Sequence, residues 1–142
     1  MPVPTAEMLR FFDELVPFNK FLGIEIVHAD DGKVRLQLPF RAEYIGDSSR
    51  PALHGGVIST LIDTAGGFAV WTRVSIDDRI STIDLRVDYL SPGGPEPLIA
   101  EAEVVRAGNR VAVTDVRVYQ PSAPGRTVAT GKAVYNIKRR DD

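Results

Sequence analysis

Cysteine is absent from the 142-residue sequence, and histidine is scarce, with only His28 and His54. The lack of cysteine excludes a disulfide framework, a thiol nucleophile and cysteine-ligated zinc or iron–sulfur sites. Two histidines leave little scope for a histidine-rich metal centre, and we expect no metal and no cofactor. If the protein is an enzyme, its catalytic groups must come from carboxylates, hydroxyls, a histidine or backbone amides.

The sequence also lacks an excess of one charge and a long apolar run. The formal net charge is -2, so we expect no surface for nucleic acid or anionic membranes. Residues 55–72 carry little charge, but four glycines and Asp63 interrupt them, which argues against membrane insertion. The first residues lack the positive charge and apolar run of a signal peptide. These features predict one soluble, cytoplasmic domain that spans residues 1–142.

Residues 55–72 have the pattern of a helix with two unlike faces. The apolar residues follow the three-and-four spacing of a buried stripe: Val57, Ile58, Leu61, Ile62, Ala65, Phe68 and Ala69. The other face is small or polar: Gly56, Ser59, Thr60, Asp63, Gly66 and Gly67. Small residues let another backbone or a ligand approach closely. We therefore expect a largely buried helix with a close neighbour on its second face.

The segments around this helix mostly read as strands. A short helix is expected to start at a Thr5 cap and to end at Pro17. Strands are expected at 22–29, 33–40, 82–89, 98–106, 111–120 and 127–138. The last of these has a face of mostly small residues, which would let the long helix sit close. The order predicts an α+β fold in which an antiparallel sheet of about six strands wraps around one central helix.

The start of the long helix is the strongest candidate for chemistry. The nucleophile motif G-x-S-x-G and the Gly-rich phosphate loops are absent, and His54-Gly55-Gly56 and Asp63 remain. Unpaired N–H groups at a helix start can stabilise an oxyanion, and Asp63 can act as a general base or nucleophile. Tight packing by the glycines and backbone capping by Asp63 explain the same residues, so residue types leave both readings open.

The spacing of Gly56 and Asp63 suggests how a site could form. The two residues share a helix face but lie about 10.5 Å apart along the axis, at about 1.5 Å per residue. One carbonyl group cannot contact both. Two antiparallel copies of the helix could place each Asp63 opposite the other chain's Gly56, which predicts two equivalent sites at a dimer interface.

The sequence LHGGVISTLIDTAGGFA, with STIDLRVDYLSPG after it, resembles the PaaI-type acyl-CoA thioesterases of the hotdog fold over about residues 20–138. The resemblance implies acyl-CoA hydrolysis by a homodimer or a dimer-of-dimers tetramer. It implies that Gly55, with Gly56 beside it, polarises the thioester carbonyl while Asp63 of the other subunit activates water or attacks directly. By the same resemblance, Thr82 assists with Ser81 as its neighbour, and His54 positions the site.

The resemblance has one departure and leaves two other functions open. The family usually has Asn and Gly where this chain has Ser48 and Pro51. Ser48 is thus expected to orient substrate or water, with Asp47 or Ser49 as alternatives. A hydratase or dehydratase is disfavoured, because Ser49 stands where the hydratase motif has an aspartate. A non-catalytic acyl-CoA-binding or sensor module is disfavoured by the cost of a carboxylate in an apolar helix.

Overall fold

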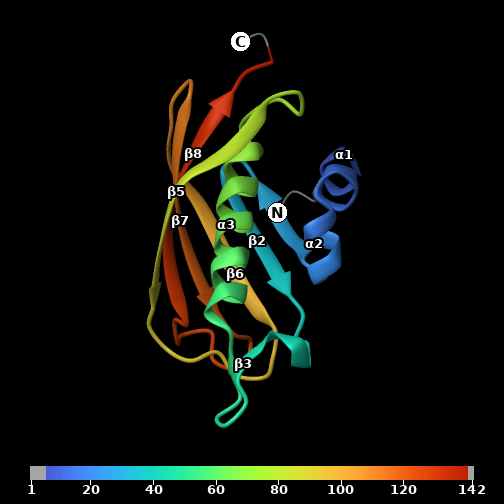
Figure 1. Cartoon of the computed structure of the whole chain (residues 1–142). Coiled ribbons are helices and arrows are strands. Elements are labelled where there is room, and N and C mark those ends of the chain that lie inside the picture. The colour runs from blue at the N-terminus through green and yellow to red at the C-terminus, as the bar shows by residue number, and fades with distance from the viewer. Residues whose placement is uncertain (1–5, 141–142) are drawn as a thin grey trace.

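The computed structural model describes residues 6–140, and its centre is the helix α3 (Gly55–Trp71). A six-stranded sheet wraps around this helix (Figure 1). Its strands are β1 (Glu25–Asp30), β2 (Lys33–Leu38), β5 (Arg79–Tyr89), β6 (Leu98–Ala107), β7 (Val111–Tyr119) and β8 (Ala129–Lys138). Every neighbouring pair is antiparallel, in the order β1-β2-β6-β7-β8-β5. The predicted α+β arrangement is confirmed.

The N-terminal part is more helical than the sequence pattern predicts. It comprises α1 (Ala6–Arg10), a π-helical turn (Phe11–Leu15) and α2 (Pro17–Leu22). The first helical segment ends at Leu15, just before Pro17, as predicted, but Pro17 then begins α2, which the pattern does not predict. Proline suits the first position of a helix, where its N–H is not needed and its φ is already helical. The expected cap Thr5 lies outside the described residues.

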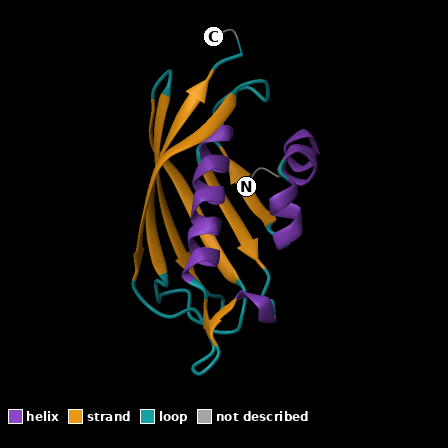
Figure 2. Cartoon of the chain, in the orientation of Figure 1, coloured by secondary structure: helices purple, strands orange, loops and turns teal. Residues whose placement is uncertain are grey.

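The extra helix shortens the first strand. The last residue of α2 is followed by Gly23, whose φ of 77° lies in the left-handed region and ends the helix. Strand β1 therefore begins at Glu25 and not at residue 22. Figure 2 shows the N-terminal helices on the side of α3 that faces away from β5. In the described part of the chain, no helix is both long and apolar enough to cross a membrane.

A small second sheet leads into α3. It consists of β3 (Ile45–Asp47) and β4 (Ala52–Leu53), preceded by the 3-10 turn η2 (Ala42–Tyr44). The Leu53 N–H donates to the Gly93 carbonyl at 2.9 Å, and the His54 N–H donates to the Tyr44 carbonyl at 2.8 Å. These backbone hydrogen bonds fix the position at which the long helix begins.

The last strand packs closely beneath α3. Its face of Ala129, Gly131, Ala133, Tyr135 and Ile137 is buried, as the pattern predicts. A Cβ on Gly131 would overlap the Ile62 side chain. The absence of a side chain at Gly131 therefore lets helix and sheet approach each other.

Gly66 does not lie on the open face of α3, where the sequence pattern places it. It is buried, and a Cβ there would lie 2.5 Å from the Tyr135 Oη and 2.6 Å from the Thr114 Oγ1. The pattern fails because the face of α3 that packs on the sheet is wider than the positions of the large apolar residues indicate, and it includes Gly66. Gly66 makes room for two polar side chains that rise from the sheet.

We expect Gly66→Ala to lower the free energy of unfolding by about 1–3 kcal/mol, the usual cost of overpacking. The matched control is Gly67→Ala, because a Cβ there would lie 3.3 Å from the nearest atom, Tyr135 Cε1. Alanine is favoured over glycine in helices by up to about 1 kcal/mol, which offsets this tight contact, so the control should lose less stability than Gly66→Ala. Urea unfolding at equal protein concentration measures both. Equal stability of the two variants would contradict this account of Gly66.

Candidate active site

The carboxylate of Asp63 is held by two hydroxyl groups from the sheet. Thr82 on β5 donates from Oγ1 to Asp63 Oδ1 at 2.8 Å. Tyr135 on β8 donates to the Asp63 carbonyl at 2.7 Å and lies 3.3 Å from Oδ1. Asp63 is half-buried, so its carboxylate is fixed in place but not fully removed from solvent. We call Asp63, Thr82 and Tyr135 the acid cluster.

Tyr135 is a member of this cluster that sequence reasoning missed. Its side chain is 2% exposed, and burial first, then the Asp63 carboxylate, raise the pKa of its hydroxyl. Tyr135 therefore stays protonated and acts as a donor. A signal was present, because a tyrosine on a buried face of small apolar residues needs a partner for its hydroxyl.

The first N–H groups of α3 differ in whether they have acceptors. The Gly56 N–H donates to His54 Nδ1 at 2.8 Å. The N–H groups of Val57 and Ile58 donate to the His54 carbonyl at 3.0 and 3.4 Å. The Gly55 N–H has no acceptor among residues 6–140. Gly55 is therefore the residue whose N–H is available to a ligand, and His54 caps its own helix.

Tyr89, at the end of β5, contacts the same helix start. Its hydroxyl donates to the Gly55 carbonyl at 3.0 Å. A Cβ on Gly55 would lie 3.3 Å from the Tyr89 ring. The tyrosine thus orients the peptide group next to the available N–H. The sequence does not predict this contact, because the alternating pattern indicates only that Tyr89 lies on a strand.

The end of β3 and the turn before β4 contain the three candidates for the role of the family's asparagine. Asp47 accepts hydrogen bonds from the Ser49 hydroxyl at 2.6 Å and from Arg50 Nε at 2.7 Å. The Ser49 side chain first, and then Arg50, lower the pKa of Asp47. Asp47 and Ser49 are therefore engaged with each other. Ser48 is exposed in this turn and remains the candidate for the positioning role.

One chain brings only part of the expected site together. A groove of about 870 Å³ is lined by the acid cluster and Ser81. Among the described residues, its lining includes neither Ser48 nor the helix start, by which we mean His54, Gly55 and Gly56. Gly55 and Asp63 are eight residues apart on one helix, about 12 Å along its axis. The two groups of residues thus occupy separate places in a single chain.

Sequence comparison identifies the family. The model of the thioesterase superfamily matches residues 51–124, which include both the helix start and the acid cluster except Tyr135. The medium/long-chain acyl-CoA thioesterase YigI of Escherichia coli K12 is 37% identical over 153 residues, covering 95% of this chain and 97% of the relative. The chain belongs to the thioesterase superfamily.

Solved structures agree with this assignment. A thioesterase family protein from Silicibacter pomeroyi superposes with a TM-score of 0.85 at 26% identity, covering 94% of this chain and 98% of that protein. The E. coli PaaI protein from the phenylacetic acid degradation operon gives a TM-score of 0.80 at 24% identity, covering 92% and 90%. The fold is the hotdog fold that the sequence resemblance implies.

Proposed function

We propose that this chain hydrolyses acyl-CoA thioesters at sites shared by two subunits. The observation that carries the proposal is the Asp63 carboxylate, which Thr82 and Tyr135 hold in place in a chain of the thioesterase superfamily. The acyl-CoA thioesterase activity named for the E. coli relative supports CoA as the leaving group.

The residues suit a hydrolytic mechanism with a divided site. The Gly55 N–H polarises the thioester carbonyl and stabilises the oxyanion that forms there. Asp63 of the other subunit either takes a proton from the attacking water or attacks the carbonyl carbon itself. When Asp63 activates water, the tetrahedral intermediate expels the CoA thiolate, which takes up a proton, and the water oxygen stays in the free acid. When Asp63 attacks, the same expulsion leaves a mixed anhydride between the acyl group and Asp63, which water then hydrolyses to the free acid and the Asp63 carboxylate. His54, Ser48 and Ser81 have the supporting roles of orienting substrate and water.

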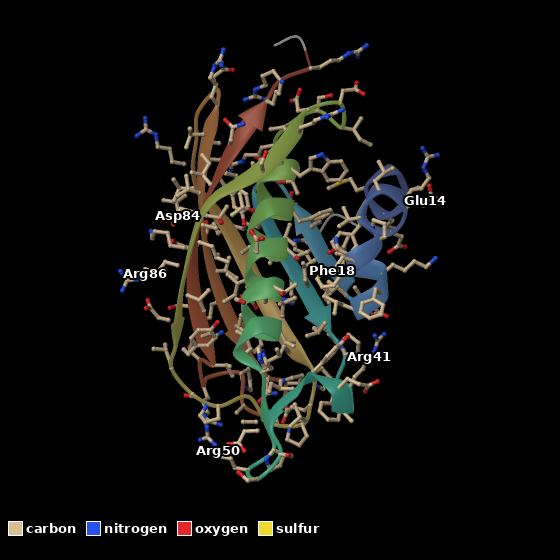
Figure 3. The ribbon with its side chains drawn as sticks, viewed as in Figure 1. Glu14, Phe18, Arg41, Arg50, Asp84 and Arg86 are labelled. Carbon is tan, nitrogen blue, oxygen red and sulfur yellow. The ribbon has the colours of Figure 1, made fainter. Side chains whose placement is uncertain are left out.

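The edge strand β5 supports the shared site. It has only β8 as a neighbour, and its Ile83 side chain is 58% exposed. Figure 3 shows Asp84 and Arg86 at this edge, on the opposite side of α3 from Phe18. Antiparallel pairing of two β5 strands would satisfy their unpaired backbone groups and place the two α3 helices side by side in opposite directions. We therefore propose a homodimer, alone or as half of a tetramer.

Mixed dimers test the shared site. Asp63→Asn and Gly55→Pro chains should each be nearly inactive, but a mixed dimer contains one site with both groups intact. With random exchange of subunits, we expect activity to return to about a quarter of the parent value, since roughly half of the dimers are mixed and each has one working site of two. Release of free CoA measures the recovery.

The exchange of subunits must be verified in the same experiment, for example by mass spectrometry of differently tagged chains. Mixed dimers that form and remain inactive would contradict the shared site. An additional assay with enoyl-CoA separates hydrolysis from hydration, because only hydrolysis releases a thiol. Binding of acyl-CoA without any thiol release would instead favour the sensor module.

A further inference from the structure

The groove that contains Asp63 has a wall of apolar side chains beside its polar groups. Asp63, Gly67 and Trp71 follow one another along α3 in its lining, so the groove runs from the middle of the helix towards its C-terminal end. Its polar groups include the hydroxyls of Thr82 and Tyr135 at Asp63. The rest of the lining includes the polar or charged residues Asn19, Asp77, Asp78 and Arg79 and these apolar side chains: Phe12, Leu15, Val16, Phe68, Trp71 and Ile76.

The N-terminal segment forms one wall of the groove and is attached to α3 by aromatic contacts. Phe12 meets Phe68 edge to face, with ring centroids 5.1 Å apart. Phe68 in turn packs on Trp71 at 5.5 Å. These three residues are buried. Leu15, by contrast, is 65% exposed at the rim. The groove therefore has a fixed aromatic floor and an exposed aliphatic rim.

The charges of the groove distinguish between the two halves of a thioester substrate. Its charged lining residues are Asp63, Asp77, Asp78 and Arg79, and Asp77 and Asp78 form ion pairs with Arg140 and Arg139. Arg79 is thus the single cation in the described lining, which is a poor match for the several phosphate charges of CoA. An uncharged hydrocarbon chain needs no cation and gains from contact with the apolar lining. The groove thus fits the acyl half of the substrate and not the nucleotide half.

The length of the groove can be compared with that of an acyl chain. Asp63 and Trp71 are eight residues apart, which corresponds to about 12 Å along the helix axis. With carbon–carbon bonds of about 1.5 Å in a zigzag, this distance accommodates an extended chain of roughly ten carbons. A bulky buried indole at the far end would oppose further extension.

We propose that this groove binds a straight acyl chain, and that Leu15 at its rim and Trp71 at its far end determine the preferred chain length. The inference rests on the proposed thioesterase function. It also assigns part of the selectivity to the N-terminal segment, which lies outside the residues 51–124 matched by the family model. Related chains with the same catalytic residues would then differ in substrate according to this segment.

The test measures kcat/KM of the full chain for straight-chain acyl-CoAs from acetyl-CoA to palmitoyl-CoA. The parent should prefer chains of roughly ten carbons. Leu15→Asn should lower the ratio of decanoyl-CoA to acetyl-CoA turnover by about tenfold, equivalent to about 1.4 kcal/mol. The matched control is Leu9→Asn, because Leu9 is exposed on α1 and does not line the groove. Its ratio should equal that of the parent.

A second variant tests the far end. Trp71→Leu should move the preferred chain length to longer acyl groups, and thermal melting shows whether it is folded. If Trp71→Leu does not fold, the comparison of Leu15→Asn with Leu9→Asn alone tests the inference. Equal ratios for Leu15→Asn and Leu9→Asn, or an unchanged length profile in folded Trp71→Leu, would overturn the inference. A parent that releases CoA from no acyl-CoA of any length would instead overturn the proposed function.

Discussion

Replacing Asp63 with asparagine should lower kcat by roughly 10²–10⁴-fold, the usual contribution of a general base. Asparagine has the same shape and keeps an oxygen that can accept the hydrogen bond now made by Thr82. The substitution therefore removes the charge and the basic oxygen while the local packing is retained. A nucleophilic role of Asp63 leads to the same expectation, because the amide cannot attack the carbonyl.

The measurement is steady-state release of free CoA, together with thermal unfolding to show that the variant is folded. The control is Asp115→Asn on β7, where the carboxylate forms an exposed ion pair with Lys132 at 2.9 Å. Such pairs contribute little to stability, and neither Asp115 nor Lys132 lines the groove, so the control should keep its activity. A folded Asp63→Asn protein with a tenth or more of the parent kcat would exclude the proposed mechanism.

Replacing Gly55 with proline should lower kcat by about 10²–10³-fold, as the loss of one oxyanion donor does. Gly55 is the first residue of α3, where proline is well tolerated. The preceding residue, His54, has φ -64° and ψ 133°, which is the conformation that a following proline favours. The substitution can therefore remove the N–H without breaking the helix.

Gly55→Ala is the matched control for this substitution. Both variants place a carbon near the Tyr89 ring, at 3.3 Å for the alanine Cβ, but alanine keeps the N–H. The alanine variant should therefore lose at most a small part of the kcat that the proline variant loses. Similar kcat values for the two folded variants would show that the Gly55 N–H does not act on the substrate, and the steric contact with Tyr89 would explain any loss.

The sequence pattern predicted the fold because strands and the long helix have regular periodicities. The alternation at β8 and the apolar stripe of α3 both report which side chains face the core. The pattern predicts the end of the first helical segment before Pro17 but not the helix that Pro17 begins, because proline is equally suited to the first position of a helix. The pattern is wrong at Gly66, because a glycine carries no polarity that would assign it to a face.

The residues themselves point to the candidate site only where they are close in sequence, and Thr82 is expected from the family resemblance alone. His54, Gly55 and Gly56 are consecutive, and Asp63 follows on the same helix, so one motif contains them. Tyr135 reaches Asp63 across 72 positions of sequence, and the Phe12 contact with Phe68 joins the N-terminal segment to α3. Contacts of this kind depend on how the sheet and the helices pack, which no local pattern encodes.

The place of β8 in the sheet also has a consequence for folding. β8 follows the other five strands of this sheet in the described chain, yet it lies between β7 and β5. Until β8 inserts, β5 has no neighbouring strand in the sheet, and no backbone pairing holds Thr82 near Asp63. Such late pairing of distant segments makes folding slow. We therefore expect the catalytic site to form only after the ten-residue strand β8 has been added to the sheet.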